Sequence, residues 1–196
     1  MGEKSIQKKE YIIEKARDVF ARKGFRAVTM KDVVEECDIS RGGLYLYFNS
    51  TKELFEAVLE RESKGQDEVI TSELKDARTA TDVMTVFLKE QKKDLLKKKN
   101  SLTIATYEFY FENQVPKKEN RIRKQYEGAV RVLESVIHAG IESGEFDVPN
   151  PKSMAQSIMM TLEGMKINAC CMGITEEVVN AQLLVIMQSL LSKENS

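Results

Sequence analysis

The chain has 196 residues and a mass of 22.3 kDa, enough to bury a hydrophobic core as one large or two small domains. Its 42% apolar and 31% charged residues, with only 3 prolines, are typical of a globular protein and exclude wholesale disorder and low-complexity repeats. The net charge of −1 shows no overall basic bias, so any case for nucleic-acid binding must rest on a local site.

Cysteine use and the lack of targeting signals predict a soluble, cytoplasmic protein. The 3 cysteines are an odd number and do not form a disulfide framework. The first residues are charged and lack the apolar stretch of a secretory signal. The longest aliphatic run, residues 183–187, is far shorter than the roughly 20 residues of a membrane span.

The single histidine argues against an enzyme. His138 has no second His or Cys at ligand spacing, and on its apolar stretch we expect it to be a partly buried structural residue. No P-loop, H-E-x-x-H or G-x-S-x-G motif occurs. The sequence therefore predicts no catalytic residues, no metal site and no cofactor.

Apolar residues recur with a period of 3.6 in almost every segment, which predicts an all-α protein. Glycine, proline and N-cap residues separate the expected helices. In chain order these cover about 5–23, 30–37, 41–47, 51–74, 82–98, 102–115, 119–143, 152–172 and 176–192.

Three N-cap signals follow one another closely after the first helix. Thr29 has an acidic residue, Asp32, three positions later, and Ser50 has Glu53, the spacing of a capping box. Ser40 is the N-cap between them, and a turn at Asp38 precedes it. Two short helices separated by this turn have the outline of a helix-turn-helix.

The second short helix begins with two glycines, Gly42 and Gly43, after Arg41. Each glycine costs a helix roughly 1 kcal/mol relative to alanine, so their presence suggests that side chains would obstruct a close partner. A helix that enters the DNA major groove by its N-terminus has this requirement. Arg41 suits a guanine edge, whereas the hydroxyls of Tyr45 and Tyr47 suit phosphates. The alternative is a solvated helical hairpin without a partner.

The charge distribution agrees with DNA binding by this region. Residues 1–52 contain 11 basic and 8 acidic residues, a net charge of +3, whereas the remainder has a net charge of −4. The asymmetry is modest, but it places the positive charge on the segment with the helix-turn-helix outline.

Three runs in this region resemble the DNA-binding domain of the TetR family of bacterial transcriptional regulators. They are Thr-Met-Lys-Asp-Val-Val at 29–34, Ile-Ser-Arg-Gly-Gly-Leu-Tyr-Leu-Tyr-Phe at 39–48 and Lys-Glu-Leu-Phe at 52–55. The resemblance covers about residues 8–60, and the rest of the chain matches the family only in outline. It implies a dimeric, all-helical regulator whose third helix reads operator DNA.

Carried over by position, the resemblance implies a set of DNA-binding residues. Those that would face bases or the adjacent backbone are Ser40, Arg41, Gly42, Gly43 and Tyr45, and those that would hold phosphates are Thr29, Tyr47 and Lys52. The sequence departs from the family at Asp38, where glycine is usual, at Tyr47, often a histidine, and at Thr51, commonly a lysine.

The last two helices have more apolar surface than one docking face requires. Residues 152–172 form two nearly opposite apolar stripes, one containing Ile158 and the other Met160, and residues 176–192 form a broad one. This excess predicts a two-fold dimer through a four-helix bundle, with a helix buried inside a monomer as the alternative. The expected interface residues are Ile158, Leu162, Met165, Leu184, Met187 and Leu191.

Aromatic residues occur on several sides of the helix expected at 102–115. They suit either plain core or a cavity for a small apolar or aromatic effector, adaptable because of nearby methionines. The residues expected to line such a cavity are Phe87, Tyr107, Tyr110, Phe111 and Met159.

Together these features predict a ligand-responsive repressor that acts as a homodimer on a palindromic operator. The expected domains are a helix-turn-helix domain at 1–50, a connecting helix at 51–75 and a helical ligand-binding and dimerisation domain at 76–196. Three alternatives remain: a DNA-bound tethering protein without an effector, a monomeric helical adaptor, and an enzyme that depends on His138.

Overall fold

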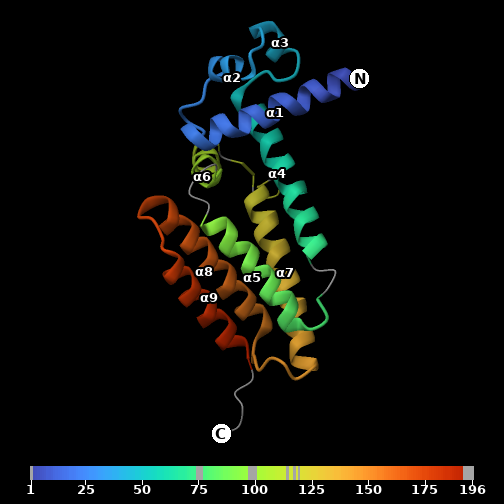
Figure 1. Cartoon of the computed structure of the whole chain (residues 1–196), viewed down its shortest axis with the longest axis vertical. Helices are drawn as coiled ribbons and strands as arrows, with labels where there is room; N and C mark the ends of the chain where they lie inside the picture. Colours follow the sequence, from blue (N-terminus) through green and yellow to red (C-terminus); the bar gives the residue numbers. More distant parts are fainter. Residues whose placement is uncertain are drawn as a thin grey trace. The chain divides into compact units, whose positions relative to one another are not determined.

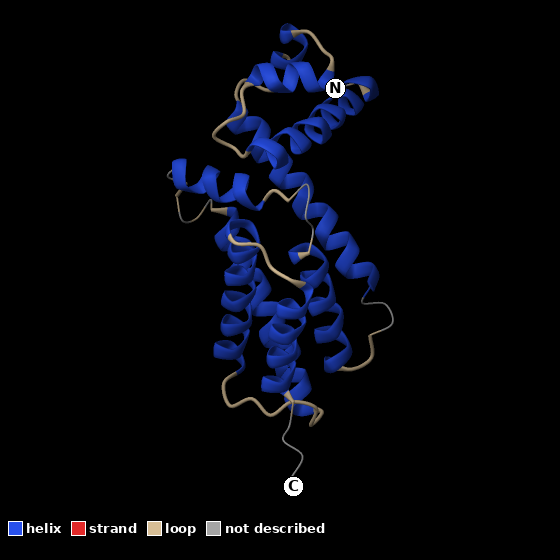
Figure 2. Cartoon of the chain, turned by 60° about the vertical axis from the view of Figure 1, so that its left-hand side comes forward, coloured by secondary structure: helices blue, strands red, loops and turns tan. Residues whose placement is uncertain are grey.

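The computed structural model describes residues 2–73, 77–96, 101–113, 115, 116, 118 and 120–191, with side chains up to residue 64 in the first range. Within these ranges the fold is all-helical, as the sequence predicts (Figure 2). The one β-type contact among these residues is an isolated bridge between Phe146 and Leu191. The helices are α1 (Glu3–Lys23), α2 (Met30–Cys37), α3 (Arg41–Tyr45), α4 (Thr51–Glu73), α5 (Ala80–Leu95), α6 (Thr103–Glu112), α7 (Arg121–Glu142), α8 (Pro151–Cys171) and α9 (Glu176–Leu190) (Figure 1).

The contacts divide the chain into two compact units. Unit 1 comprises Met1–Glu68 and Lys98–Gln114, and unit 2 comprises Val69–Lys97 and Val115–Ser196. The sequence places the segment around α6 in the C-terminal domain, but its contacts group it with the N-terminal helices. The division of the core therefore does not follow chain order.

Unit 1 is built around buried aromatic rings. Phe20 of α1, Phe25 after it and Phe55 of α4 have ring centroids 4.6–6.1 Å apart. Phe109 of α6 joins them, 5.0 Å from Phe25 and 5.3 Å from Phe55. Ring pairs at these distances are favourable beyond the area they bury, so Phe109 holds α6 to the N-terminal helices.

Glu108 of α6 also packs closely against the turn that follows α1. Gly24 has a φ of +77°, and a Cβ there would lie 2.5 Å from Oε2 of Glu108 on α6. The same Oε2 accepts a hydrogen bond from the backbone N–H of Arg26 at 3.1 Å. Glycine at this position thus supplies both the left-handed backbone and the space for the carboxylate.

Unit 2 is a helical bundle with an aliphatic and methionine-rich core. α7 packs against α8 and α5, and α5 also contacts α8 and α9 (Figure 1). Met84, Met159 and Met165 are buried in this core with leucines, isoleucines and valines. Phe146 closes one end, because its ring occupies the space above Gly140 that a side chain would fill.

Most helix starts follow from the predicted caps. Thr29 and Asp32 form the expected capping box, and the Oγ of Ser40 accepts from the N–H of Gly43 at 3.1 Å. Ser50 caps α4, but the Glu53 carboxylate accepts from the N–H of Asn49 instead of closing the box on Ser50. An unpredicted capping box of Thr79 and Asp82 starts α5 at Ala80, two residues earlier than expected.

His138 lies exposed on α7, so the expectation that it is a partly buried structural residue is wrong. The α7 residues that do enter the core are Val130, Leu133, Ile137 and Gly140. Because Ile137 already takes the core-facing position, the next residue along the helix points away from the core.

Candidate DNA-binding site

The turn at Asp38, between α2 and α3, and the buried residues after it set the position of α3 in unit 1. Asp38 ends α2 with φ 50° and ψ 49°, the left-handed conformation that Asp adopts more readily than most residues. The departure from glycine at this position therefore leaves the turn geometry intact. Leu44 and Phe48 are buried, as their spacing predicts, and they anchor α3 to the core of unit 1.

The two glycines of α3 differ in what surrounds them. A Cβ on Gly42 would meet no atom within 4 Å, and a Cβ on Gly43 would meet only the capping Oγ of Ser40 at 3.2 Å. Neither residue has a positive φ. Nothing within the described part of the chain requires glycine at position 42, so the missing side chain leaves a smooth surface available to an external partner.

The exposed side of α3 carries the guanidinium of Arg41 and the ring of Tyr45. The guanidinium of Arg41 lies 5.5 Å from the ring centroid of Tyr45, a cation–π contact that orients it without neutralising its charge. Arg41 forms no ion pair among the described residues. Tyr45 is 38% exposed.

Leu46, directly after α3, is 80% exposed, and it is absent from the predicted DNA-binding residues. The positions four residues before and after it are Gly42 and Ser50, whereas Leu44 and Phe48 share the core face. This pattern is the signal that identifies Leu46 as exposed. An exposed leucine on this surface can contact thymine methyl groups or sugars.

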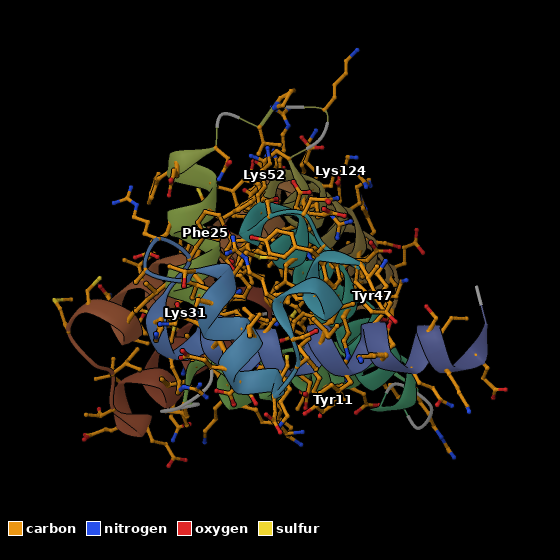
Figure 3. The ribbon with its side chains drawn as sticks, turned by 90° about the horizontal axis from the view of Figure 1, so that it is seen from above. Tyr11, Phe25, Lys31, Tyr47, Lys52 and Lys124 are labelled. Atoms are coloured by element: carbon orange, nitrogen blue, oxygen red, sulfur yellow. The ribbon has the colours of Figure 1, made fainter. Side chains whose placement is uncertain are left out.

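The three predicted phosphate-binding residues have different surroundings. The hydroxyl of Tyr47 accepts from Ser5 Oγ at 3.4 Å, which leaves its own O–H free to donate. Lys52 is exposed at the start of α4 and forms no ion pair among the described residues. Figure 3 shows Tyr47 and Lys52 on separate segments of unit 1.

Thr29 has no donor left for a phosphate. Its hydroxyl and its backbone N–H both donate to Oδ2 of Asp32, at 2.9 and 2.8 Å. The hydrogen bond from Lys23, together with those from Thr29, lowers the pKa of Asp32 to about 2, so this carboxylate stays charged. A phosphate at the start of α2 would have to displace or approach a carboxylate, which weakens the predicted role of Thr29.

The predicted dimer residues separate into two groups. Ile158, Leu162 and Met165 lie in the core of unit 2, so their assignment to an interface is wrong: a buried side chain has no exposed surface for a partner to cover. Met187 is partly buried against the same core. Leu184 is 57% exposed and Leu191 is also exposed, and both remain available.

The second apolar stripe of α8 is the exposed one. Met160 is 66% exposed, and Ile167 and Cys171 of the same stripe are exposed as well. On α9 the exposed apolar residues include Val185 beside Leu184. Periodicity locates both stripes of α8 but does not say which one the chain itself covers.

The predicted pocket residues come from both units. Tyr107, Tyr110 and Phe111 lie on α6 in unit 1, whereas Phe87 and Met159 belong to the core of unit 2 or pack against it. Phe111 is 78% exposed, and its role in lining a ligand cavity stays a prediction. It stacks on Tyr107, with ring centroids 6.2 Å apart, on the outer side of α6.

Tyr126 of α7 is a further polar group that the sequence does not indicate. Its side chain packs against the core of unit 2, and its hydroxyl oxygen is buried without a hydrogen-bond partner among the described residues. A buried hydroxyl without a partner is costly, so a bound molecule or water that pairs with it would stabilise unit 2.

Within the part of the chain that the structure describes, no helix combines the length and apolar character needed to cross a bilayer. Likewise, no three His, Cys, Asp or Glu side chains among those residues gather where a metal ion would fit.

The candidate site is a short, capped helix with a bare first turn, and its cation and polar groups face outward.

A helix-turn-helix whose second helix has a smooth, cationic N-terminal end defines a DNA-binding protein. Residues 12–58 match the family described as bacterial regulatory proteins, tetR family, and residues 83–180 match the tetracyclin repressor-like C-terminal domain. The chain belongs to the TetR family and is a DNA-binding transcriptional regulator.

Similar proteins agree with this assignment. The HTH-type transcriptional regulator YfiR of Bacillus subtilis is 34% identical over 163 residues, which cover 81% of this chain and 78% of YfiR. QacR of Staphylococcus aureus, also an HTH-type regulator, is 24% identical over 80% of this chain and 83% of its own length. A regulator from Saccharomonospora viridis, solved with choline, has the same fold, with a TM-score of 0.84 over 94% of this chain and 98% of that one at 18% identity.

Proposed function

We propose that the chain is a homodimeric repressor that binds a palindromic operator and releases it when a small organic molecule enters the C-terminal domain. The observation that carries the DNA-binding part is the open space at Gly42. The fold gains nothing from glycine there and loses about 1 kcal/mol of helix stability, whereas a groove-bound helix gains a close approach of its backbone to the bases.

In this mechanism α3 reads the bases, and residues after it and on α4 contact phosphates. Arg41, oriented by Tyr45, donates a bidentate pair of hydrogen bonds to a guanine edge. Tyr47 and Lys52 contact phosphates on either side and set the register of the helix, since phosphate contacts position a protein without reading the sequence. The free hydroxyl proton of Tyr47 and the unpaired ammonium of Lys52 support these roles.

A second copy of the chain is the partner that we assign to the exposed apolar face of α8 and α9. Met160 and Ile167 on α8, with Leu184 on α9 and Leu191 directly after it, offer apolar surface that a monomer would leave in water. A two-fold dimer places two α3 helices about one turn of DNA apart, roughly 34 Å, so that each enters a major groove of a palindrome.

The core of unit 2 is the part of the chain to which we assign the effector. The methionines in the core of unit 2 can repack around a small apolar or aromatic molecule, and the hydroxyl of Tyr126 offers it one polar contact. The S. viridis relative with choline shows that a protein of this fold holds a small organic molecule. Such a ligand shifts the protein away from the DNA-bound state by the difference in its affinity for the two states.

The test uses a duplex selected by the wild-type chain from a random library. Gly42→Leu should lower affinity for this duplex at least ~100-fold, because the side chain fills the space that the DNA would occupy. Gly128→Leu on α7 is the matched control and should leave affinity unchanged, since a Cβ there has its nearest neighbour, a nitrogen of Arg131, at 3.9 Å. Arg41→Ala should cost about 1–3 kcal/mol at a guanine position and little at other bases.

Equal affinity of the two leucine variants would remove α3 from the groove and overturn the proposal. The tethering alternative, which has no effector, is distinguished by the second part of the experiment. A screen of small molecules against the protein–duplex complex should find one that lowers affinity, whereas a domain that only tethers a protein partner responds to none.

A further inference from the structure

The first two turns of α1 lie outside the region that matches the family. The helix begins at Glu3, whereas the family match begins at residue 12. Figures 1 and 3 show these first turns continuing past α3 at the same end of unit 1. These turns form helical surface beside the DNA-binding site.

Side-chain contacts hold this added surface against the end of α3. Ser5 Oγ lies 3.4 Å from the hydroxyl of Tyr47, and Nζ of Lys9 lies 5.4 Å from the ring centroid of Phe48. Because Ser5 and Lys9 are one helical turn apart, the whole first part of α1 is fixed relative to α3.

The acidic residues of this segment lie on the flank that faces α4. Glu3, Glu10 and Glu14 follow the spacing of one helical stripe. Arg61 of α4 pairs with Glu14 at 3.0 Å and with Glu10 at 3.9 Å. The negative charge of Glu10 and Glu14 is therefore turned toward α4 and partly neutralised there.

The basic residues lie on the opposite flank. Lys4, Lys8 and Lys15 share a stripe with Tyr11, whose hydroxyl donates to the backbone carbonyl of Cys37 at 3.4 Å. That contact places the stripe alongside the end of α2, where the turn to α3 begins (Figure 3). Lys4 and Lys8 are exposed and form no ion pair among the described residues.

We propose that Lys4 and Lys8 form a second DNA contact, to backbone phosphates that lie outside the half-site read by α3. The inference rests on the DNA-binding function and extends it to a surface that the family match leaves out. The partner is the phosphate backbone, because the two lysines are exposed, form no ion pair among the described residues and share a stripe with Tyr11, which contacts the end of α2 beside the turn to α3.

This contact lengthens the footprint of each half-site without adding sequence preference. A lysine that neutralises a phosphate releases counterions, so affinity acquires a steeper dependence on salt, about 0.9 units of slope in log K against log [salt] for each contact. The protein then contacts only the backbone of the base pairs next to the half-site, so the sequence of those base pairs should not change the affinity.

The experiment compares two double variants with equal charge change, Lys4→Gln/Lys8→Gln and Lys89→Gln/Lys152→Gln. The second pair is exposed on α5 and α8 of unit 2 and is the control. Affinity is measured by fluorescence anisotropy between about 50 and 300 mM NaCl on the selected duplex, with about 10 extra base pairs at each end or with none.

The wild-type chain and the control should bind the extended duplex with the same salt slope and more tightly than the trimmed one. Lys4→Gln/Lys8→Gln should reduce the slope by about 0.9 for each phosphate that is no longer neutralised, and it should no longer distinguish the two duplexes. Its affinity for the trimmed duplex should match that of the wild type, which also shows that α3 is intact.

Equal slopes for the two double variants would overturn the inference while leaving the DNA-binding function in place. Failure of the wild-type chain to select any duplex would overturn both. Weaker binding of Lys4→Gln/Lys8→Gln to the trimmed duplex would also overturn the inference, since it would place these lysines inside the half-site or in the support of α3.

Discussion

The two units of the chain fill their cores with different side chains. Unit 1 relies on rings: Phe20, Phe25, Phe55 and Phe109 pack against one another with centroids no more than 6.1 Å apart. Unit 2 has buried methionines among leucines, isoleucines and valines, and Phe146 at one end.

This difference matches the tasks of the two units. Aromatic side chains have few rotatable bonds and interlock, so they hold α1, α4 and α6 in one arrangement, and Leu44 and Phe48 anchor α3 to this unit. Methionine has three rotatable bonds and fills irregular space, so a core that contains it changes shape at low cost. The part proposed to read DNA is packed rigidly, and the part proposed to bind an effector is packed adaptably.

The largest expected effect tests the rigidity of unit 1. Phe55 is fully buried among three other rings, so Phe55→Ala should lower the free energy of unfolding by about 3–5 kcal/mol. Met159→Leu in unit 2 keeps nearly the same volume and should cost less than about 1.5 kcal/mol. Urea denaturation followed by circular dichroism measures both, and similar destabilisation by the two would show that the two cores are equally specific.

A smaller effect comes from two glycines of the same helix, α7. Gly140→Ala places a Cβ 2.1 Å from the ring of Phe146 and should destabilise the protein by about 1–3 kcal/mol. Gly128→Ala has room and should stabilise it by as much as about 1 kcal/mol, because alanine favours the helix. If Phe146 is fixed, thermal denaturation should show a lower melting temperature for Gly140→Ala and a higher one for Gly128→Ala. An unchanged melting temperature for Gly140→Ala would show that Phe146 moves aside.

The smallest expected effect concerns one capping carboxylate in each unit. Hydrogen bonds from the side chain and backbone of Thr81, with others from Ser143 and Ala80, lower the pKa of Glu145 to about 2. The pKa of Asp32 is also about 2, but its largest cause is the hydrogen bond from the charged Lys23. Salt screens the second kind of interaction more than the first.

Raising NaCl from about 0.05 to 1 M should therefore raise the pKa of Asp32 and leave that of Glu145 unchanged in NMR titrations. Both folded-state values lie below the ordinary ones, so both groups stabilise the fold above about pH 4.5, and this contribution is lost as the pH falls toward 2. Glu145→Gln should remove the Glu145 part of this pH dependence. A salt-sensitive Glu145 would point to a charged partner instead of the helix start that it caps.

Local signals make most helices predictable. The caps at Thr29 and Ser40 and the stop at Gly24 act within one or two turns, so they can be read without knowing what packs against them. The start of α5 is two residues earlier than predicted because the Thr79 cap, and not the apolar pattern, decides where the helix begins. Since the α3 surface also depends on local caps and spacing, it is largely predictable, with the exception of Leu46.

Long-range packing makes the remaining features unpredictable. Both stripes of α8 are apolar, and only the positions of α5 and α7 decide that Ile158 is covered and Met160 is not. α6 has aromatic residues on several sides, and it is the ring cluster around Phe25 that takes Phe109 and leaves Phe111 in water.

The all-helical class, the positions of the helices and the candidate DNA-binding surface follow from the amino-acid order alone. Each of these depends on interactions between residues a few positions apart, and the chemistry of those residues is visible in one dimension. Three features needed the folded chain: which apolar face is core, which unit holds α6 and which flank of α1 presents Lys4 and Lys8. They depend on which distant surfaces meet, because an apolar stripe is satisfied by any complementary one.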